Sequence, residues 1–240
     1  MHTLLDLRGN LPVSVYLTTA SVNDVKGLDE LYIEPAAIYL MDKGYVDFNR
    51  LFKLINKKNA FFVTRAKDNM LFEVVSASSV DQSTGVIADE HIKLTGLRTS
   101  KWYPEELRMV TYEDYATNNV YRFLTNNMEY EAITISELYR ERWNVEQFFK
   151  WIKQHLHIKS FYGTSENAIY LQIWIAICTY LLLAYAKKVM HIEQSLHTIS
   201  KNVGLFLTDK THLNELFNKA VPKEEPEDLW YPSLFKPDDF

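Results

Sequence analysis

The first seventy residues alternate between short apolar runs and polar segments, a pattern that predicts a mixed α/β arrangement. Four apolar runs have the length of β-strands and are separated by turn residues: 2–7, 13–19, 36–41 and 60–64. Helical spacing of the apolar positions predicts helices over 22–32 and 48–56. The order hairpin, helix, strand, helix, strand favours a mixed sheet with helices on its faces.

From residue 71 onward the pattern changes to short strand-like runs between polar turns: Phe72–Val75, Val86–Ile87, His91–Leu94, Leu107–Tyr112 and Val120–Leu124. These runs predict a β-rich insertion, followed by helices. We therefore expect four parts: a first core segment over 1–70, the insertion over 71–127, two core helices over 128–190, and a C-terminal helical segment with an acidic, proline-rich tail over 191–240.

The segment after the insertion predicts one long helix. Thr134 and Glu137 form a capping-box pattern, which places the helix start near Ile135. An apolar stripe continues along it through Leu138, Val145, Phe149, Ile152 and Leu156. Such a stripe would bury the helix against a sheet.

A second, polar stripe lies on the same predicted helix and contains Tyr139, Arg142, Glu146 and Lys153. At about 100° per residue, these side chains fall within roughly a 60° arc. One carboxylate is flanked by a phenol and two cations. The carboxylate can hold a metal, and the cations can bind the phosphates on which the metal acts. This arrangement indicates phosphodiester chemistry. The alternative is a solvated helix face with ordinary pairs such as Glu146 with Lys150.

Charge and composition limit the possible partners only weakly. The net charge of −5 and the pI of about 5.8 are not typical of a protein that binds nucleic acid over its whole surface. Between Tyr139 and Lys159, however, five basic residues stand against two acidic ones, so a local basic cleft is compatible with DNA. The single cysteine, Cys178, lies in an apolar stretch over 170–186 that is short for a membrane span, which predicts a buried helix in a reducing compartment.

The polar stripe has the spacing Y-x2-R-x3-E-x6-K, and in this spacing it resembles the signature of the IS-four group of insertion-sequence transposases. Five further blocks resemble that family in the same order: Leu5–Pro12, Tyr39–Phe48, Phe61–Lys67, Phe123–Asn126 and Phe161–Ala168. The resemblance covers nearly the whole chain. It implies an RNase H-like mixed sheet flanked by helices and interrupted by a β-rich insertion, with a catalytic triad of two aspartates and a glutamate.

The resemblance also implies roles for individual residues. Asp42, which follows a predicted buried strand, and Glu146 would be catalytic metal ligands for Mg²⁺, with Mn²⁺ as a substitute; for Asp42 the alternative is an ordinary turn or cap residue. Tyr139, Arg142 and Lys153 would bind DNA phosphates. The implied partners are double-stranded DNA, namely transposon inverted repeats and target DNA, and a second copy on that DNA, with no membrane. The implied location is the bacterial cytoplasm, associated with the nucleoid.

The family's first catalytic aspartate has no match in this chain, because its strand would precede Met1. Asp6 lies within a predicted strand and on the wrong strand for that role, so we interpret it as structural. The expected function is therefore that of a transposase catalytic domain for Mg²⁺-dependent DNA cleavage and strand transfer that is inactive alone. The alternatives are a non-catalytic DNA-binding remnant of a transposase, a structural protein with a solvated charged helix, and an RNase H-like nuclease unrelated to transposition.

Overall fold

The computed structural model describes residues 1–18, 24–155, 162–206, 208, 210 and 217. These residues divide into two compact units. Among the described residues, the first unit contains 1–2 and 18–143, and the second contains 3–17 and most of the chain from Asn144 onward. Each unit is described by itself.

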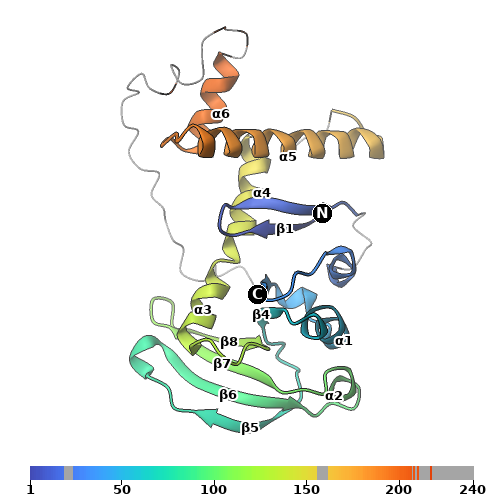
Figure 1. Cartoon of the computed structure of the whole chain (residues 1–240), viewed down its shortest axis with the longest axis vertical. Helices are drawn as coiled ribbons and strands as arrows, with labels where there is room; N and C mark the ends of the chain where they lie inside the picture. Colours follow the sequence, from blue (N-terminus) through green and yellow to red (C-terminus); the bar gives the residue numbers. More distant parts are fainter. Residues whose placement is uncertain (19–23, 156–161, 207, 209, 211–216, 218–240) are drawn as a thin grey trace. The chain divides into compact units, whose positions relative to one another are not determined.

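The first unit is built on a six-stranded mixed sheet with the strand order β3-β4-β8-β7-β6-β5 (Figure 1). The strands are β3 (Ile38–Met41), β4 (Phe61–Arg65), β5 (Phe72–Ser78), β6 (Val86–Leu94), β7 (Leu107–Asp114) and β8 (Asn119–Thr125). β3 pairs with β4 in parallel, and every other neighbouring pair in this sheet is antiparallel. The predicted mixed α/β fold is confirmed.

The β-rich run after residue 71 is confirmed as strands, and these strands extend the sheet that contains β3 and β4. The junction is the antiparallel pair β4–β8, in which Thr64 lies opposite Leu124. The two short runs expected over 86–94 form one strand, β6, in which the polar residues Asp89 and Glu90 pair in register with β7. The proposed division of the chain at 71 and 127 stays a prediction.

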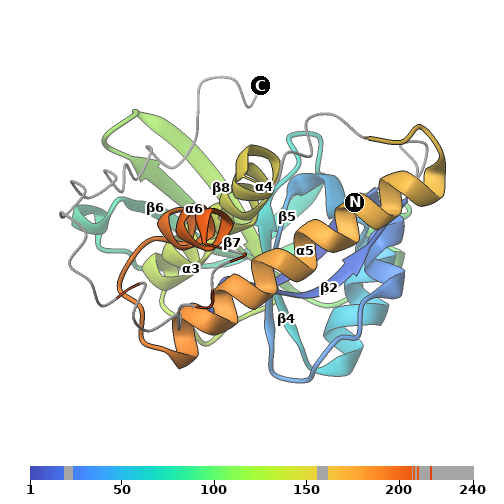
Figure 2. The same cartoon turned by 90° about the horizontal axis from the view of Figure 1, so that it is seen from above.

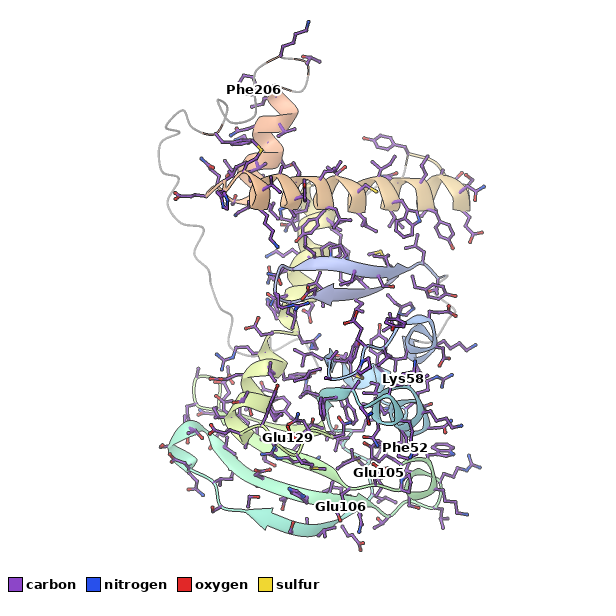
Figure 3. The ribbon with its side chains drawn as sticks, in the orientation of Figure 1. Phe52, Lys58, Glu105, Glu106, Glu129 and Phe206 are labelled. Atoms are coloured by element: carbon purple, nitrogen blue, oxygen red, sulfur yellow. The ribbon has the colours of Figure 1, made fainter. Side chains whose placement is uncertain are left out.

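Short helices and one longer helix accompany the sheet: η1 (Asp24–Glu30), η2 (Lys43–Tyr45), α1 (Phe48–Arg50), the π-helical η3 (Leu51–Ile55), η4 (Asn56–Lys58), α2 (Thr99–Trp102) and α3 (Ala132–Arg140). α3 buries Ile135 and Tyr139 against apolar side chains of β4, β7 and β8. Phe52 of η3 packs edge-on against Tyr103, which in turn packs against Phe62 of β4. Figure 3 labels Phe52 and Glu105 in this region.

Local sequence explains where α1 begins. Asp47 is extended, and its Oδ1 accepts a hydrogen bond from the backbone N–H of Arg50 at 3.0 Å, so it caps the helix. The Arg50 guanidinium also pairs with Asp29 of η1 at 2.9 Å. These contacts fix the segment that follows β3 and Asp42.

The turn from β8 into α3 is held by a buried ion pair. Arg108 of β7 donates from Nε and Nη2 to the two carboxylate oxygens of Asp89 at 2.7 and 2.8 Å, and both residues are buried. Its Nη1 donates to the backbone carbonyls of Asn127 and Tyr130. The direction in which α3 leaves the sheet is therefore set by hydrogen bonds to a buried charge.

The second unit combines a β-hairpin with helices. Its elements are β1 (His2–Asp6), β2 (Leu11–Tyr16), α4 (Trp143–His155), α5 (Glu166–Val189) and α6 (Leu196–Leu205). The core consists of Leu5, Phe148, Ile152, Ala176, Ile177 and Tyr180. α5 lies against β2 (Figure 2), and the Tyr180 hydroxyl donates to the carbonyl of Asn10 in the hairpin turn at 2.8 Å.

α5 is only partly the buried helix that the sequence predicts. Its 24 residues are long and apolar enough to cross a membrane by length and composition, yet only 22% of the most apolar window is buried. One face packs into the core, whereas Leu171, Leu182 and Cys178 are exposed. The expectation that Cys178 is buried is wrong, because it lies on the face of α5 opposite to Ala176 and Ile177. The predicted acidic tail lies outside the described residues.

Candidate active site

Asp42 lies directly after β3, at the edge where the parallel strands β3 and β4 both end. The pair Met41–Thr64 is in register, so the residues that follow, Asp42 and Arg65, leave the sheet side by side. The carboxylate of Asp42 caps η2: its Oδ1 accepts from the backbone N–H of Gly44 at 2.9 Å. Its side chain is 49% exposed, so the second oxygen remains accessible for other chemistry.

That second oxygen faces Arg142. Nη1 of Arg142 lies 3.9 Å from Oδ2 of Asp42, although the two residues are one hundred positions apart in the chain. The Arg142 side chain is largely buried, with an exposed fraction of 17%. At this separation the two groups attract each other without a direct hydrogen bond, which leaves lone pairs of Asp42 available to a further ligand.

Tyr139 lies beneath Arg142. Its ring is 2% exposed, packs on Phe123 of β8 with ring centroids 4.9 Å apart, and lies 5.6 Å from the guanidinium carbon of Arg142. Burial raises the pKa of the Tyr139 hydroxyl to about 12, and the negative charge of Asp42 adds to this while Arg142 and Arg65 act against it. The phenol is therefore neutral at ordinary pH, and its ring face supports the guanidinium.

Arg65 is a second guanidinium at the same place. It is the last residue of β4, and its guanidinium carbon lies 5.3 Å from the ring centroid of Tyr121. The parallel register with β3 places the backbone of Arg65 next to that of Asp42, while its guanidinium lies over the ring of Tyr121 on β8. Lys67 instead donates from Nζ to the carbonyl of Val46 at 3.0 Å.

The single long helix predicted for the polar stripe is wrong. The chain forms α3 up to Arg140 and α4 from Trp143, with Glu141 and Arg142 in a turn between them. The Arg142 N–H donates to the Tyr139 carbonyl at 3.1 Å, which is a three-residue turn rather than an α-helical bond. α3 also begins at Ala132, without the predicted capping box.

The break separates the four residues of the stripe between the two units. Tyr139 and Arg142 belong to the first unit with Asp42, and Glu146 and Lys153 belong to the second. On α4 the latter two are seven residues apart and therefore share a helix face. That face points away from Phe148 and Ile152, which pack into the core. Glu146 is half-buried and Lys153 is exposed.

Asp6 has the structural role that the sequence suggested. It is the last residue of β1, and both of its carboxylate oxygens accept hydrogen bonds from the Arg8 side chain at 3.1 Å. The Arg8 hydrogen bonds lower the pKa of Asp6 below its usual value. An aspartate that is neutralised by its own turn is poorly suited to hold a metal.

In the described part of the chain, no three His, Cys, Asp or Glu side chains gather closely enough to hold a metal ion by themselves. Asp42 nevertheless suits a single carboxylate ligand: it is half exposed, and one of its oxygens is not engaged by the backbone. Mg²⁺ accepts one or two protein carboxylates and takes its remaining ligands from water and phosphate.

The fold and this site define a mixed α/β domain that presents the Asp42 carboxylate beside the Arg142 guanidinium, at the edge where the parallel strands β3 and β4 end. Such an arrangement is typical of sites for phosphorylated ligands. The chain belongs to the Transposase DDE domain family, whose sequence model matches residues 1–182. The resemblance to transposases inferred from the sequence is confirmed.

The chain is similar to three curated transposases. It is 37% identical over 196 residues to the putative transposase y4zB of Sinorhizobium fredii, a match that covers 80% of this chain and 54% of the relative. It is 28% identical over 186 residues to a probable transposase for insertion sequence element IS5377 of Geobacillus stearothermophilus, covering 77% and 48%. A putative transposase for element IS4SA of Synechocystis is 27% identical over 187 residues, covering 75% and 47%.

The chain thus spans about half the length of the curated relatives that it matches. No solved structure gives a significant match.

Proposed function

We propose that this chain is the catalytic part of an insertion-sequence transposase, which cuts DNA at the ends of the element and joins it to target DNA. The observation that carries the proposal is the approach of Arg142 Nη1 to within 3.9 Å of Asp42 Oδ2 after β3, in a chain whose family match covers residues 1–182. A carboxylate suits a metal, and guanidinium groups suit the phosphates on which a metal acts.

In this proposal Asp42 and Glu146 hold Mg²⁺, or Mn²⁺ in its place. A pair of such ions supplies activation of the attacking oxygen and neutralisation of the leaving oxygen in phosphodiester chemistry. The half-exposed Asp42 carboxylate is positioned by Gly44, and Glu146 lies in the first turn of α4 on the face away from the core. Together the two acids give the site its metal affinity.

The cations bind and orient DNA. Arg142 and Arg65 make bidentate contacts with phosphate oxygens, and Lys153 makes a point-charge contact further along the backbone. The burial of Tyr139 favours a supporting role: it holds the Arg142 guanidinium over its ring, and its hydroxyl reaches a phosphate only if the turn at 141–142 moves. The partners are then double-stranded DNA of the inverted repeats and of the target.

We expect the 240-residue chain by itself not to cleave DNA. Two carboxylates rarely suffice for two metal ions, because one must bridge both ions and each ion needs a further anchor. Family resemblance also suggests that the active form is a homodimer on DNA and that it works in the bacterial cytoplasm, close to the nucleoid.

The second candidate is a DNA-binding transposase remnant without catalysis. It rests on the same guanidinium pair, which attracts phosphate whether or not a metal binds. The two candidates differ in their dependence on divalent metal, because a remnant has no use for Glu146.

The experiment that tests the proposal measures binding of the purified chain to duplex DNA as a function of salt, with and without Mg²⁺. If the chain is the catalytic part of a transposase, its DNA binding should depend on salt and be strengthened by Mg²⁺. Glu146→Gln should then remove the effect of Mg²⁺. Binding that ignores both Mg²⁺ and Glu146→Gln favours the remnant. Absence of salt-dependent binding contradicts both. Robust plasmid cleavage by the wild-type chain, abolished in Glu146→Gln, would overturn the expectation of inactivity.

A further inference from the structure

α5 carries two apolar faces, and the core of its unit uses only one of them. The buried residues Ala176, Ile177, Tyr180 and Leu183 pack within the second unit. A second line of side chains on the helix is exposed: Leu171, Ile175, Cys178, Leu182, Tyr185 and Val189. We call this line the α5 seam. In Figure 3, side chains also project from α5 on the side away from the β1–β2 hairpin.

The spacing of the α5 seam is that of a helix-packing surface. Its residues follow one another at intervals of four, three, four, three and four, which is the alternation that keeps a straight line of contacts on one side of a helix. Leu182 is 69% exposed, Tyr185 65% and Leu171 62%. A helix that is apolar on all sides is normally buried on all sides, so the exposed seam suits a binding partner.

We propose that the α5 seam binds the α5 seam of a second copy of this chain, with the two helices antiparallel. The seam is nearly symmetric about Cys178: Leu171 and Tyr185 lie seven residues before and after it. In an antiparallel pair centred on Cys178, each Leu171 therefore meets the partner's Tyr185, and Ile175 lies against the partner's Leu182. Complementary apolar contacts form from Leu171 to Tyr185.

The charges of α5 favour the same direction. Between its first residue, Glu166, and Lys187 the helix has no charged side chain, and Lys187 and Lys188 close its last turn. An antiparallel pair places Glu166 of each copy beside the two lysines of the other, whereas a parallel pair stacks like charges at both ends. Glu166 also accepts a hydrogen bond from Tyr170 at 2.8 Å through Oε1, which leaves its other oxygen for the lysines.

The area of the α5 seam suits a stable pair. Its exposed side chains, together with the neighbouring Trp174, present several hundred square ångströms of apolar surface, the scale of the roughly 800 Å² that each partner buries in a typical protein interface. Apolar patches of that size seldom remain uncovered on proteins in water. The inference concerns association without DNA, so it stands or falls apart from the proposed catalysis.

The test uses the chain's own cysteine, which is the only one in its sequence. A short bismaleimide added to the purified protein in the absence of DNA is expected to link two copies through Cys178, because the symmetry axis brings the two thiols together. The matched variant carries Asn167→Cys in a Cys178→Ser background. Its two cysteines would lie about 33 Å apart in the antiparallel pair, so no short link forms.

Sedimentation of the same protein gives the second readout. The chain is expected to form a dimer whose dissociation constant rises more than about tenfold in Leu182→Glu, since the change places a charge in the seam without touching the core. Leu97→Glu, a change at a leucine that is 91% exposed in the other unit, is expected to leave the dimer intact.

Three results would overturn the inference. A monomer at every concentration shows that the seam has another occupant, and binding of that monomer to lipid vesicles identifies the occupant as a membrane. Linking through Asn167→Cys shows that the helices are parallel. Association that survives Leu182→Glu shows that copies meet through a different surface.

Discussion

Nη1 of Arg142 lies 3.9 Å from Oδ2 of Asp42, which joins the turn after α3 to the end of β3. The contact matters because it brings a potential phosphate ligand to a potential metal ligand. The Tyr139 ring lies 5.6 Å from the guanidinium carbon of Arg142, and Arg65 is the last residue of β4, the parallel neighbour of β3. Arg142, Asp42 and Tyr139 are therefore expected to work as one site.

Replacement of Arg142 by alanine is expected to weaken binding to duplex DNA of any sequence by roughly tenfold or more, because a charge-assisted phosphate contact contributes about 1.5–3 kcal/mol. The slope of log affinity against log salt concentration should fall by about one unit. Arg140→Ala is the matched control, since Arg140 is an exposed arginine two residues earlier. Equal losses in the two variants would show that only the general basic charge matters.

Replacement of Asp42 by asparagine is expected to strengthen DNA binding in the absence of metal. The carboxylate competes with phosphate for Arg142, so its removal frees the guanidinium and raises affinity by a few fold. Fluorescence anisotropy with labelled duplex DNA in EDTA measures the change. Asp68→Asn, at an exposed acid 3.6 Å from Arg122, is the control and should have little effect. Weaker binding by Asp42→Asn would show that Asp42 is needed only to fold the η2 turn.

Tyr139 should influence stability in alkaline solution. Its pKa is raised to about 12 by burial, above the value of about 10 in an unfolded chain. The folded state thus holds this proton more tightly than the unfolded state does. The resulting contribution to the free energy of unfolding is complete below pH 10 and is lost as the pH rises towards 12. Wild type should lose about 2 kcal/mol more unfolding free energy over this interval than Tyr139→Phe. Urea titrations at both pH values measure the difference.

Tyr162→Phe is the control for that experiment, because the Tyr162 side chain is 91% exposed. It should lose stability with pH as wild type does. If Tyr139→Phe behaves in the same way as this control, then Tyr139 is not buried in the folded protein.

The buried Asp89–Arg108 pair should be costly to break from one side. Arg108→Met leaves the Asp89 carboxylate buried without its partner and is expected to cost about 3–5 kcal/mol of unfolding free energy. The double variant Asp89→Leu with Arg108→Met should recover part of that loss. By contrast, Arg8→Ala removes a pair in which Arg8 is 91% exposed and should cost about 1 kcal/mol or less. A similar cost in both single variants would contradict the burial of Arg108.

The sequence predicted the strands and the acid at the end of β3 well, because apolar runs of four to six residues bounded by turn residues carry a local signal. The cap at Asp47 is likewise a local feature, since capping depends on a contact only three residues away. The position of Arg142 beside Asp42 could not follow from local patterns, because it depends on the register of β3 with β4 and on the turn after α3.

The break between α3 and α4 shows where helical periodicity fails. The segment from Thr134 to Lys153 keeps a polar stripe across the break, so the spacing alone indicates one helix. Tyr139 is nevertheless drawn into the core against Phe123, and Arg142 turns towards Asp42. Tertiary packing therefore overrides helical propensity at Glu141 and Arg142. The exposed second face of α5 was missed for a related reason, since composition cannot tell a helix buried on all sides from one with an unused apolar face.

If Asp42 and Glu146 hold metal together, as proposed, iron-mediated cleavage of the polypeptide should reveal it most directly. The DNA-bound chain is loaded with Fe²⁺ in place of Mg²⁺ and then treated with ascorbate and peroxide. The bound iron should cut the polypeptide backbone near residues 42 and 146. Excess Mg²⁺ should suppress both cuts, and Asp42→Asn or Glu146→Gln should each reduce both. Cuts that appear at neither residue, or at one residue regardless of the other acid, would contradict a shared metal site.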